Sequence, residues 1–288
     1  MTPPQRNSWT AALLAVCAMQ MLPLGDGIAK HLSADYPVLQ LVWARFFFHF
    51  VFAAPPALVK FSPAAFRVPH PVVQLRRGAF LAAATLLFFS SFRHLPLADA
   101  IALLFTSPIL LVLLSRFTLG ERVGVDRWLA VSVGFVAVLL IVRPGFASFH
   151  WASLLALGAA FAFTMYLRET RLLSGTAPPL VTLVYQSLVP LAVLSLVAPL
   201  VWVWPSPGDW LLMAGIGAAA TGGHFLLIKS FEYADASFVA PFNYTEIVMA
   251  TAIGYLLFGD LPDLWTWTGI ALIIATAVYL TLPARRPG

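Results

Sequence analysis

Charged residues are scarce in this sequence. They make up 10% of its 288 residues, whereas 60% of the residues are hydrophobic, and soluble domains carry about 25% charged residues. So few charges cannot cover the surface of a soluble protein of this length. Cysteine is scarcer still, because Cys17 is the only one, and this excludes an intramolecular disulfide and a cysteine-ligated metal cluster. The composition therefore indicates an integral membrane protein.

Sequence motifs of catalysis and ATP binding are missing as well. There is no His-Glu-x-x-His, no paired-histidine metal spacing, no Gly-x-Ser-x-Gly and no P-loop. A filter-like loop or a ring of charges, which a channel needs, is also absent. The net charge of +5 comes from basic residues in short loops and does not indicate a nucleic-acid partner. We expect no enzyme activity, no metal and no cofactor, and we keep a membrane-embedded enzyme as the alternative from another class.

What the sequence does contain is a series of apolar runs, each long enough to cross a hydrocarbon core of about 30 Å. We predict an all-α integral membrane protein with ten transmembrane helices, at residues 9–30, 37–59, 75–94, 97–117, 127–143, 151–171, 179–204, 209–230, 236–258 and 264–283. The first run is interpreted as a retained helix rather than a signal peptide. Since only residues 60–74 are long enough to form a real loop, residues 1–288 are expected to form a single transmembrane domain in the lipid bilayer.

The distribution of lysine and arginine predicts the orientation in the membrane. If the N-terminus is cytoplasmic, most of these residues fall on the cytoplasmic side, and only Lys30, Arg93 and Arg143 fall on the outer side. An excess of lysine and arginine in the cytoplasmic loops is typical of membrane proteins. We therefore expect a multi-pass protein of the cell inner membrane with both termini in the cytoplasm.

The chain also repeats itself once, at a nearly constant offset. Matching positions include Trp9 and Trp151, Pro37 and Pro179, Gly120-Glu121 and Gly259-Asp260, and Trp128 and Trp267. Each unit, about 7–143 and 149–283, contains five predicted crossings. Because five is odd, the second unit enters the membrane from the opposite face. The sequence therefore predicts two inverted five-helix repeats, an architecture common among secondary transporters.

Several motifs follow this repeat: Arg45-Phe46 after Pro37, Ser107-Pro108, Leu119-Gly120-Glu121-Arg122, Thr245-Glu246 and Phe258-Gly259-Asp260. Together they resemble the drug/metabolite transporter superfamily, EamA-type branch. Two departures from the family pattern are Ile247, where a proline is usual, and Leu24-Gly25-Asp26, where the family often has Trp-Gly and an uncharged polar residue.

The resemblance implies a secondary transporter that moves a small organic metabolite by alternating access. Within the family, the chain looks most like bacterial exporters of aromatic and other neutral amino acids. Sugars, nucleotide sugars, vitamins and drugs are the alternative substrate classes. We expect the protein to function as a monomer and consider a proton as the coupling ion.

Polar residues near the membrane midplane are the first candidates for the substrate site. Gln20, Thr106, Ser107 and Glu246 each lie about 15 Å into their predicted spans, and Asn243 and Tyr244 are close to Glu246. Transporters with inverted repeats bind substrate at this depth. Glu246 is the only acidic residue predicted there. Its carboxyl group could bind a substrate amine, carry a proton, or only hydrogen-bond a neighbouring helix.

Further candidates lie on other predicted spans. Arg45 sits within a span, where a charge is costly, and contact with Asp26 is feasible. This pair could close an outer gate or could only fix two helices together. His224, Trp43 and Tyr166 could line an apolar cavity, although histidines and aromatic residues in such positions are also common packing residues.

Overall fold

The computed structural model describes residues 8–107, 109–110, 114, 125–142, 150–173, 176–230, 233 and 240–281, and no strand occurs within these ranges. The helices in this part of the chain are α1 (Ser8–Leu32), α2 (Val38–Lys60), α3 (Pro71–Phe92), α4 (Leu97–Leu104), α6 (Val125–Val142), α7 (Ala152–Leu172), α8 (Pro179–Val197), α9 (Pro207–Ser230), α11 (Glu246–Phe258) and α12 (Leu264–Thr281). Three 3-10 turns accompany them, η1 (Pro63–Phe66), η2 (Ala198–Val201) and η3 (Ala240–Thr245). The predicted all-α fold class is confirmed.

Five of these helices are long and apolar enough to cross a bilayer by length and composition. They are α1, α2, α3, α8 with its 3-10 extension, and α9. The helix bounds follow the predicted spans closely, with two informative differences. In the predicted span at 97–117, helix α4 ends at Leu104, a turn at Phe105 and Thr106 follows, and the later residues that the structure describes, 107, 109–110 and 114, are helical again. The span at 236–258 is divided between η3 and α11 in its described part. Hydropathy reports the length of an apolar run, but it does not report breaks in the backbone inside that run.

Proline and glycine set several helix ends. Helices α3, α8 and α9 begin on Pro71, Pro179 and Pro207, and proline is favourable there because the first N–H of a helix needs no partner. Helix α11 ends at Gly259, which adopts a left-handed conformation with φ of 72° and donates its N–H to the carbonyl of Tyr255. That conformation suits glycine because it has no Cβ.

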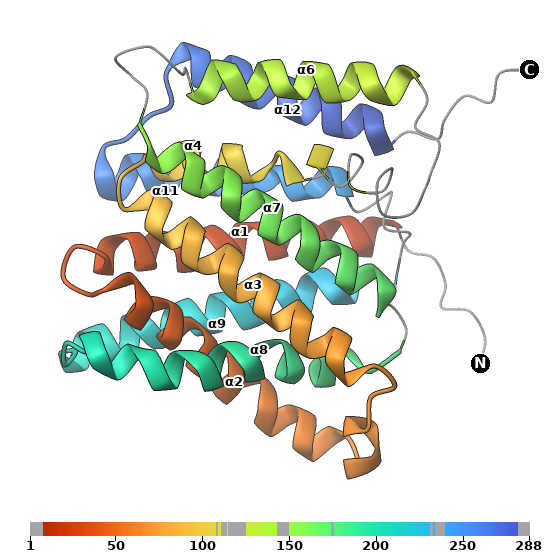
Figure 1. The fold of residues 1–288 in the computed structure, drawn as a ribbon, viewed down its shortest axis with the longest axis vertical. Coiled ribbons are helices and arrows are strands. Elements are labelled where there is room, and N and C mark those ends of the chain that lie inside the picture. The colour runs from red at the N-terminus through yellow and green to blue at the C-terminus, as the bar shows by residue number, and fades with distance from the viewer. Residues whose placement is uncertain are drawn as a thin grey trace, which may run out of the picture.

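The contacts between helices are symmetric under exchange of the two halves of the chain. Helix α1 packs on α9 as α3 packs on α7, and α1 packs on α11 as α4 packs on α7. The pairs α2 with α8, α4 with α11, and α6 with α12 each join equivalent helices. Figure 1 shows these three pairs one above another along the long axis of the molecule, with α6 and α12 at one end and α2 and α8 at the other. Such a pattern is what two inverted repeats produce.

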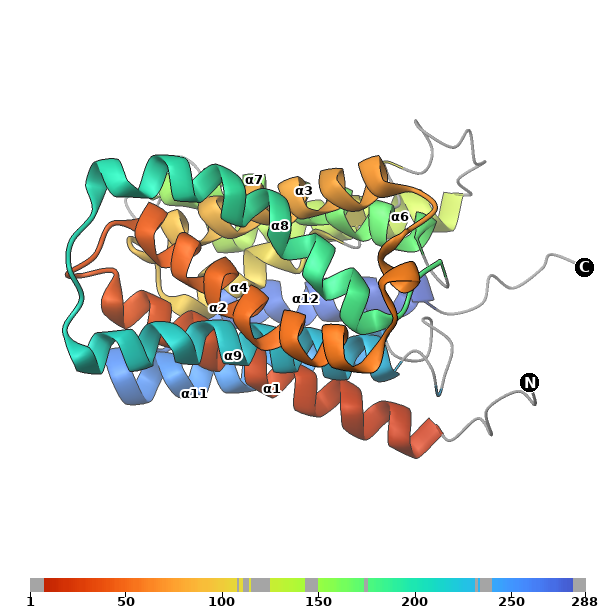
Figure 2. The same cartoon turned by 90° about the horizontal axis from the view of Figure 1, so that it is seen from below.

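Helix α1 begins and helix α12 ends on the same side of the bundle (Figure 2). We call this the terminal side and the opposite one the distal side. An even number of crossings requires this arrangement. The turn between α1 and α2 and the glycine that ends α11 consequently lie on the distal side, whereas the 3-10 turn η1 between α2 and α3 lies on the terminal side.

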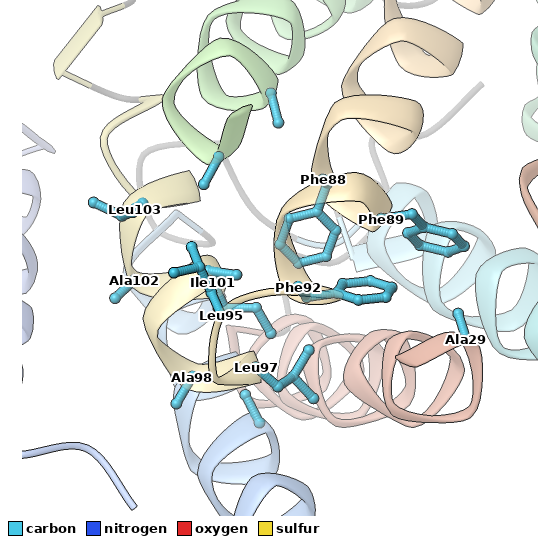
Figure 3. Close-up of a cluster of buried hydrophobic side chains, with 14 of the residues drawn as sticks. Ala29, Phe88, Phe89, Phe92, Leu95, Leu97, Ala98, Ile101, Ala102 and Leu103 are labelled. Atoms are coloured by element: carbon cyan, nitrogen blue, oxygen red, sulfur yellow. The ribbon is translucent and has the colours of Figure 1, made fainter. Parts of the chain in front are cut away.

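A cluster of buried phenylalanines holds the first-half helices together. Phe88, Phe89 and Phe92 of α3 pack against the residues that lead into α4, including Leu95 and Leu97 (Figure 3). Ring centroids of Phe89 and Phe92 lie 4.8 Å apart, and those of Phe88 and Phe92 lie 5.3 Å apart in an edge-to-face arrangement. These contacts fix α3 and the start of α4 beside α1, on which part of the candidate site is built.

Candidate functional site

In each half of the molecule, one helix is interrupted at an equivalent position. Helix α4 stops at Leu104, and a turn at Phe105 and Thr106 follows. In the second half, the 3-10 turn η3 gives way to α11 at Glu246, the repeat equivalent of Ser107. The two interruptions meet, because the Phe105 and Tyr244 rings pack edge to face with centroids 5.1 Å apart. Broken helices near the midplane build substrate and ion sites in transporters.

Glu246 occupies the first position of α11. The free N–H groups of a helix N-terminus favour a negative charge. Gln20 of α1 supports this junction by donating its side-chain Nε2–H to the carbonyl of Thr245, 3.0 Å away, and to the Thr245 hydroxyl, 3.3 Å away. Gln20, Tyr244 and Glu246, all predicted from the sequence, are thus brought together. The side chain of Asn243, predicted with them, lies outside the described part of the structure.

Three charged side chains, Asp26, Arg45 and Glu246, form what we call the charged triad. Arg45 Nη1 lies 3.1 Å from Asp26 Oδ1, and the two side chains are only 11% and 6% exposed. The Arg45 guanidinium also lies 5.6 Å from the centre of the Phe89 ring. Both Asp26 and Arg45 act electrostatically on Glu246. The structure therefore forms the Asp26–Arg45 contact considered from the sequence, and the Glu246 carboxyl lies within electrostatic range of that pair but forms no ion pair with Arg45 in the described part of the structure.

A chain of buried polar side chains continues from the triad toward α3 and α8. His49 is one helical turn from Arg45 on α2, and its ring centroid lies 6.2 Å from that of His224 on α9. The His224 ring lies 6.4 Å from Tyr166 of α7. The Tyr166 hydroxyl donates to Gln186 Oε1 at 3.2 Å. His224 and Tyr166, both predicted candidates, are therefore neighbours in one polar path.

Sequence reasoning missed the far end of this path, at Arg77. Arg77 Nη2 donates to Gln186 Oε1 at 3.1 Å, and the Arg77 side chain is among the largest that are fully buried. In the sequence it stands beside Arg76, and the charge distribution predicts both as orienting residues on the cytoplasmic side. The available signal was the i, i+3 spacing of Gln74 and Arg77, which places two polar residues on one face of an apolar helix.

Three predicted candidates lie in other surroundings. The Trp43 ring stacks on Phe47 at 4.7 Å, and its Nε1–H donates to the Ser195 hydroxyl at 2.9 Å. Thr106 donates its hydroxyl to the carbonyl of Leu103, and Ser107 donates to Ala160 of α7 at 3.2 Å. The Thr106 and Ser107 hydroxyls thus have backbone partners in this conformation. A role for these three residues in substrate binding stays a prediction.

Polar contacts tie the distal side of the bundle together. Lys30 of α1 donates to Asp260 Oδ2 and to the carbonyl of Leu95, both at 3.0 Å. Tyr36 donates to Asp209 Oδ2 at 2.8 Å, and burial together with this hydrogen bond raises the pKa of Tyr36. A cavity of about 420 Å³ with basic residues in its lining, Lys30, His31 and Arg93 among them, lies on this side.

A second set of polar contacts ties the terminal side. Glu169 of α7 is fully buried and accepts from Arg76 of α3 at 2.6 Å and from Arg168 at 2.9 Å. Tyr185 of α8 donates to the carbonyl of Phe66 at 2.6 Å. Within the described residues, no three side chains of the metal-binding types come together. The candidate site is therefore a set of ionic and amide groups between helices of both halves, with polar contacts between helices on each side of the bundle.

Comparison with known proteins gives this arrangement a family. The model of the EamA-like transporter family matches the chain twice, at residues 9–143 and 150–282. A solved crystal structure matches 98% of this chain and 99% of its own chain with a TM-score of 0.66 and 22% sequence identity, which supports the fold.

Relatives with named activities are transporters of small molecules. The S-adenosylmethionine uptake transporter of Rickettsia prowazekii is 26% identical over 91% of this chain and 89% of its own. The pseudopaline exporter of Pseudomonas aeruginosa is 29% identical over 94% and 96%. The riboflavin transporter of Vibrio cholerae is 34% identical, but the match spans 65% of this chain and 63% of that protein. These relatives are transporters and not enzymes, and the chain belongs to the EamA-like family of membrane transporters for small metabolites.

Proposed function

We propose that this protein is a secondary transporter of the inner membrane that carries a zwitterionic metabolite with an amino-acid head group. The observation that carries the proposal is the charged triad, in which Arg45 pairs with Asp26 and the Glu246 carboxyl lies within electrostatic range of both, between α1, α2 and α11. A substrate ammonium group supplies the missing positive charge. Glu246, at the junction of η3 and α11, is the group we assign to that ammonium.

Alternating access is supported by the exchange symmetry of the helix contacts. Two inverted halves that pack on each other through equivalent surfaces can exchange their roles, and this opens one side as the other closes. The terminal side is proposed to be cytoplasmic because basic residues gather there, including Arg67 and Arg76 beside the turn η1. When no amine is bound, Glu246 is the group we propose to carry a coupling proton.

Export of neutral and aromatic amino acids is the narrowest form of this proposal. S-adenosylmethionine has the same amino-acid head group on a larger molecule, and it is taken up by the relative from Rickettsia prowazekii, whose match covers 91% of this chain. We propose export as the direction of transport because the sequence resembles amino-acid exporters. The named relatives include both an uptake transporter and an exporter. We expect the single chain to be the transport unit because both halves of the site come from it.

The test is counterflow in liposomes that contain the purified protein. Labelled phenylalanine and labelled S-adenosylmethionine are offered, with unlabelled 3-phenylpropionate, which lacks the amine, as a competitor. We expect movement of at least one labelled compound and little competition from 3-phenylpropionate. Glu246→Gln keeps the shape of the side chain and cannot be ionised, so it should abolish movement in protein that still elutes as a folded species. Transport of neither compound by the wild-type protein would refute the proposal.

A riboflavin-like substrate is the second candidate, and two observations favour it. A 34% identical relative is a riboflavin transporter. Aromatic rings also stand at the site, where Phe105 packs on Tyr244 and Phe163 stacks on Tyr166 at 5.4 Å, and such rings suit a planar fused-ring ligand. Liposomes that move riboflavin, but neither amino-acid compound, would select this candidate.

A further inference from the structure

The cavity of about 420 Å³ on the distal side lies among the ends of three helices. Residues at the end of α1 and in the turn after it, the residue that follows α3, and the end of α11 contribute to its lining, with Lys30, His31, Ala34, Arg93, Leu257 and Phe258 among them. Cavities that hold small ligands have volumes of about 300–1,000 Å³. This cavity is therefore large enough for a small molecule or for the head group of a lipid.

Basic residues gather at this cavity although they are rare on its side of the protein. The sequence assigns three lysines and arginines to the outer side, and two of them, Lys30 and Arg93, line the cavity. His31 adds a third basic side chain to the lining. Because lysine and arginine are depleted on the outer side of membrane proteins, two of them at one cavity indicate a local function.

The two cations differ in how far their charge is already compensated. Lys30 Nζ lies 3.0 Å from Asp260 Oδ2 and donates to the carbonyl of Leu95. Arg93 is exposed, and no ion pair among the described residues includes it. The carboxyl group of Asp35, in the turn after α1, is exposed and does not belong to the lining. Arg93 therefore supplies an uncompensated positive charge, and its planar guanidinium suits the oxygens of a phosphate group.

The cavity also borders an apolar surface of α11. Leu257 lines the cavity and is 60% exposed, and the preceding Leu256 is 77% exposed. In a membrane protein, exposed apolar side chains of a helix contact the acyl chains of lipids. Trp265, near the start of α12 on the same side, is exposed too, as is typical of the border between acyl chains and head groups. An anion at Arg93 would thus lie at the level of the lipid head groups.

We propose that this cavity binds the phosphodiester of an anionic phospholipid, with Arg93 as its main partner and the acyl chains along Leu256 and Leu257. A lipid with one net negative charge matches the uncompensated charge of Arg93, whereas a zwitterionic lipid brings a cation of its own. Basic pockets between transmembrane helices bind the head groups of anionic lipids. The site uses no group of the charged triad and does not depend on which metabolite is transported.

The test measures lipid binding to the detergent-solubilised protein by native mass spectrometry and by the shift in melting temperature. Phosphatidylglycerol, which is anionic, is compared with the zwitterionic phosphatidylcholine. We expect the wild-type protein to prefer phosphatidylglycerol and Arg93→Gln to bind it about tenfold more weakly, because charge-assisted hydrogen bonds are lost. Arg93→Lys should be intermediate because the charge remains but the planar fork is lost. The matched control Arg67→Gln removes an exposed charge on the terminal side and should leave the preference unchanged.

Ala34→Trp separates binding in the cavity from a general attraction between charges. Ala34 is exposed and lines the cavity, so a larger side chain there should fill space without disturbing the fold and without removing a cation. Phosphatidylglycerol binding should fall as it does in Arg93→Gln. Wild-type binding of phosphatidylglycerol by either the Ala34→Trp or the Arg93→Gln protein would overturn the site.

Inorganic phosphate distinguishes a lipid from a soluble anion. It can reach Arg93 but cannot use the apolar border of the cavity, so we expect sodium phosphate to stabilise the wild-type protein no more than sodium chloride of equal ionic strength. Stabilisation by phosphate as large as that by phosphatidylglycerol, and absent in Arg93→Gln, would assign the cavity to a soluble anion and refute the lipid. Since both readouts work without transport, a negative counterflow result would contradict the proposed function and leave the lipid site standing.

Discussion

The charged triad makes an asymmetric prediction about stability. Arg45 is the cation that pairs with Asp26, so the triad carries a net charge of about −1 once Glu246 has released the proton that we propose it carries, and the prediction applies at alkaline pH, where that carboxyl group is ionised. Arg45→Gln leaves the carboxyl groups of Asp26 and Glu246 within electrostatic range of each other and without the cation. Asp26→Asn leaves Arg45 with Glu246, a neutral pair. The two single substitutions remove the same ion pair, yet we expect them to differ greatly.

The expected loss in free energy of unfolding follows from the burial of Arg45 and Asp26. The side chains of Arg45 and Asp26 are 11% and 6% exposed, so the pair belongs with buried ion pairs, in which loss of one partner costs about 3–5 kcal/mol. We expect this loss for Arg45→Gln, part of it from the contact with the Phe89 ring. Asp26→Asn should cost about 1–2 kcal/mol because Glu246 remains as a counter-ion.

The assay is a double-mutant cycle on the free energy of unfolding, measured by titrating sodium dodecyl sulfate into detergent micelles. Asp26→Asn or Glu246→Gln, introduced into the Arg45→Gln protein, should restore about 1–3 kcal/mol, since each removes one of the two facing carboxylates. Strict additivity, or equal losses for Arg45→Gln and Asp26→Asn, would show that the three groups do not act as one electrostatic unit.

Two further predictions concern packing and topology. Gly217→Ala should lower the free energy of unfolding by about 1–3 kcal/mol, because a Cβ there would lie 2.9 Å from the backbone nitrogen of His49. Gly215→Ala should be nearly neutral, because its Cβ would meet only the end of the Ile28 side chain. Equal melting temperatures for the two variants in detergent would contradict this prediction. In a cysteine-free background, an impermeant thiol reagent added to intact cells should label Ala34→Cys on the distal side and not Ala64→Cys in η1, and the reverse pattern would invert the proposed orientation.

The membrane architecture could be predicted from the sequence because it depends on quantities that a sequence displays. Apolar run lengths gave the helices, and the matching of Pro37 with Pro179 and of Trp9 with Trp151 indicated the repeat. The depth estimate placed Gln20 and Glu246 at one level, and the structure joins them through Thr245. Such predictions succeed because the bilayer sets the minimum length of an apolar run that crosses it.

The parts that could not be predicted depend on which face of each helix is buried. The helices are apolar on all sides, so periodicity does not distinguish a lipid-facing residue from a buried one. Arg77 therefore looked like its neighbour Arg76, although one is fully buried and the other is half exposed. Part of the aromatic surroundings of Trp43 comes from a residue far away in the chain, Trp202 at 5.1 Å, and no local pattern predicts that contact.

The exchange symmetry of the helix contacts has a consequence for the assembly of this protein. In the described part of the chain, the extensive contacts, α1 with α9, α3 with α7, α2 with α8 and α6 with α12, all join one half to the other, while contacts within a half are slight. Apart from the phenylalanine cluster of α3 and the start of α4, each half therefore buries its helices mainly against the other half. Two separately expressed half-chains, cut between α6 and α7, should be degraded when alone and recover transport when produced together. We therefore expect each repeat unit to need the other, in the inverted orientation, in order to fold, and the linker between α6 and α7 to serve only to join them.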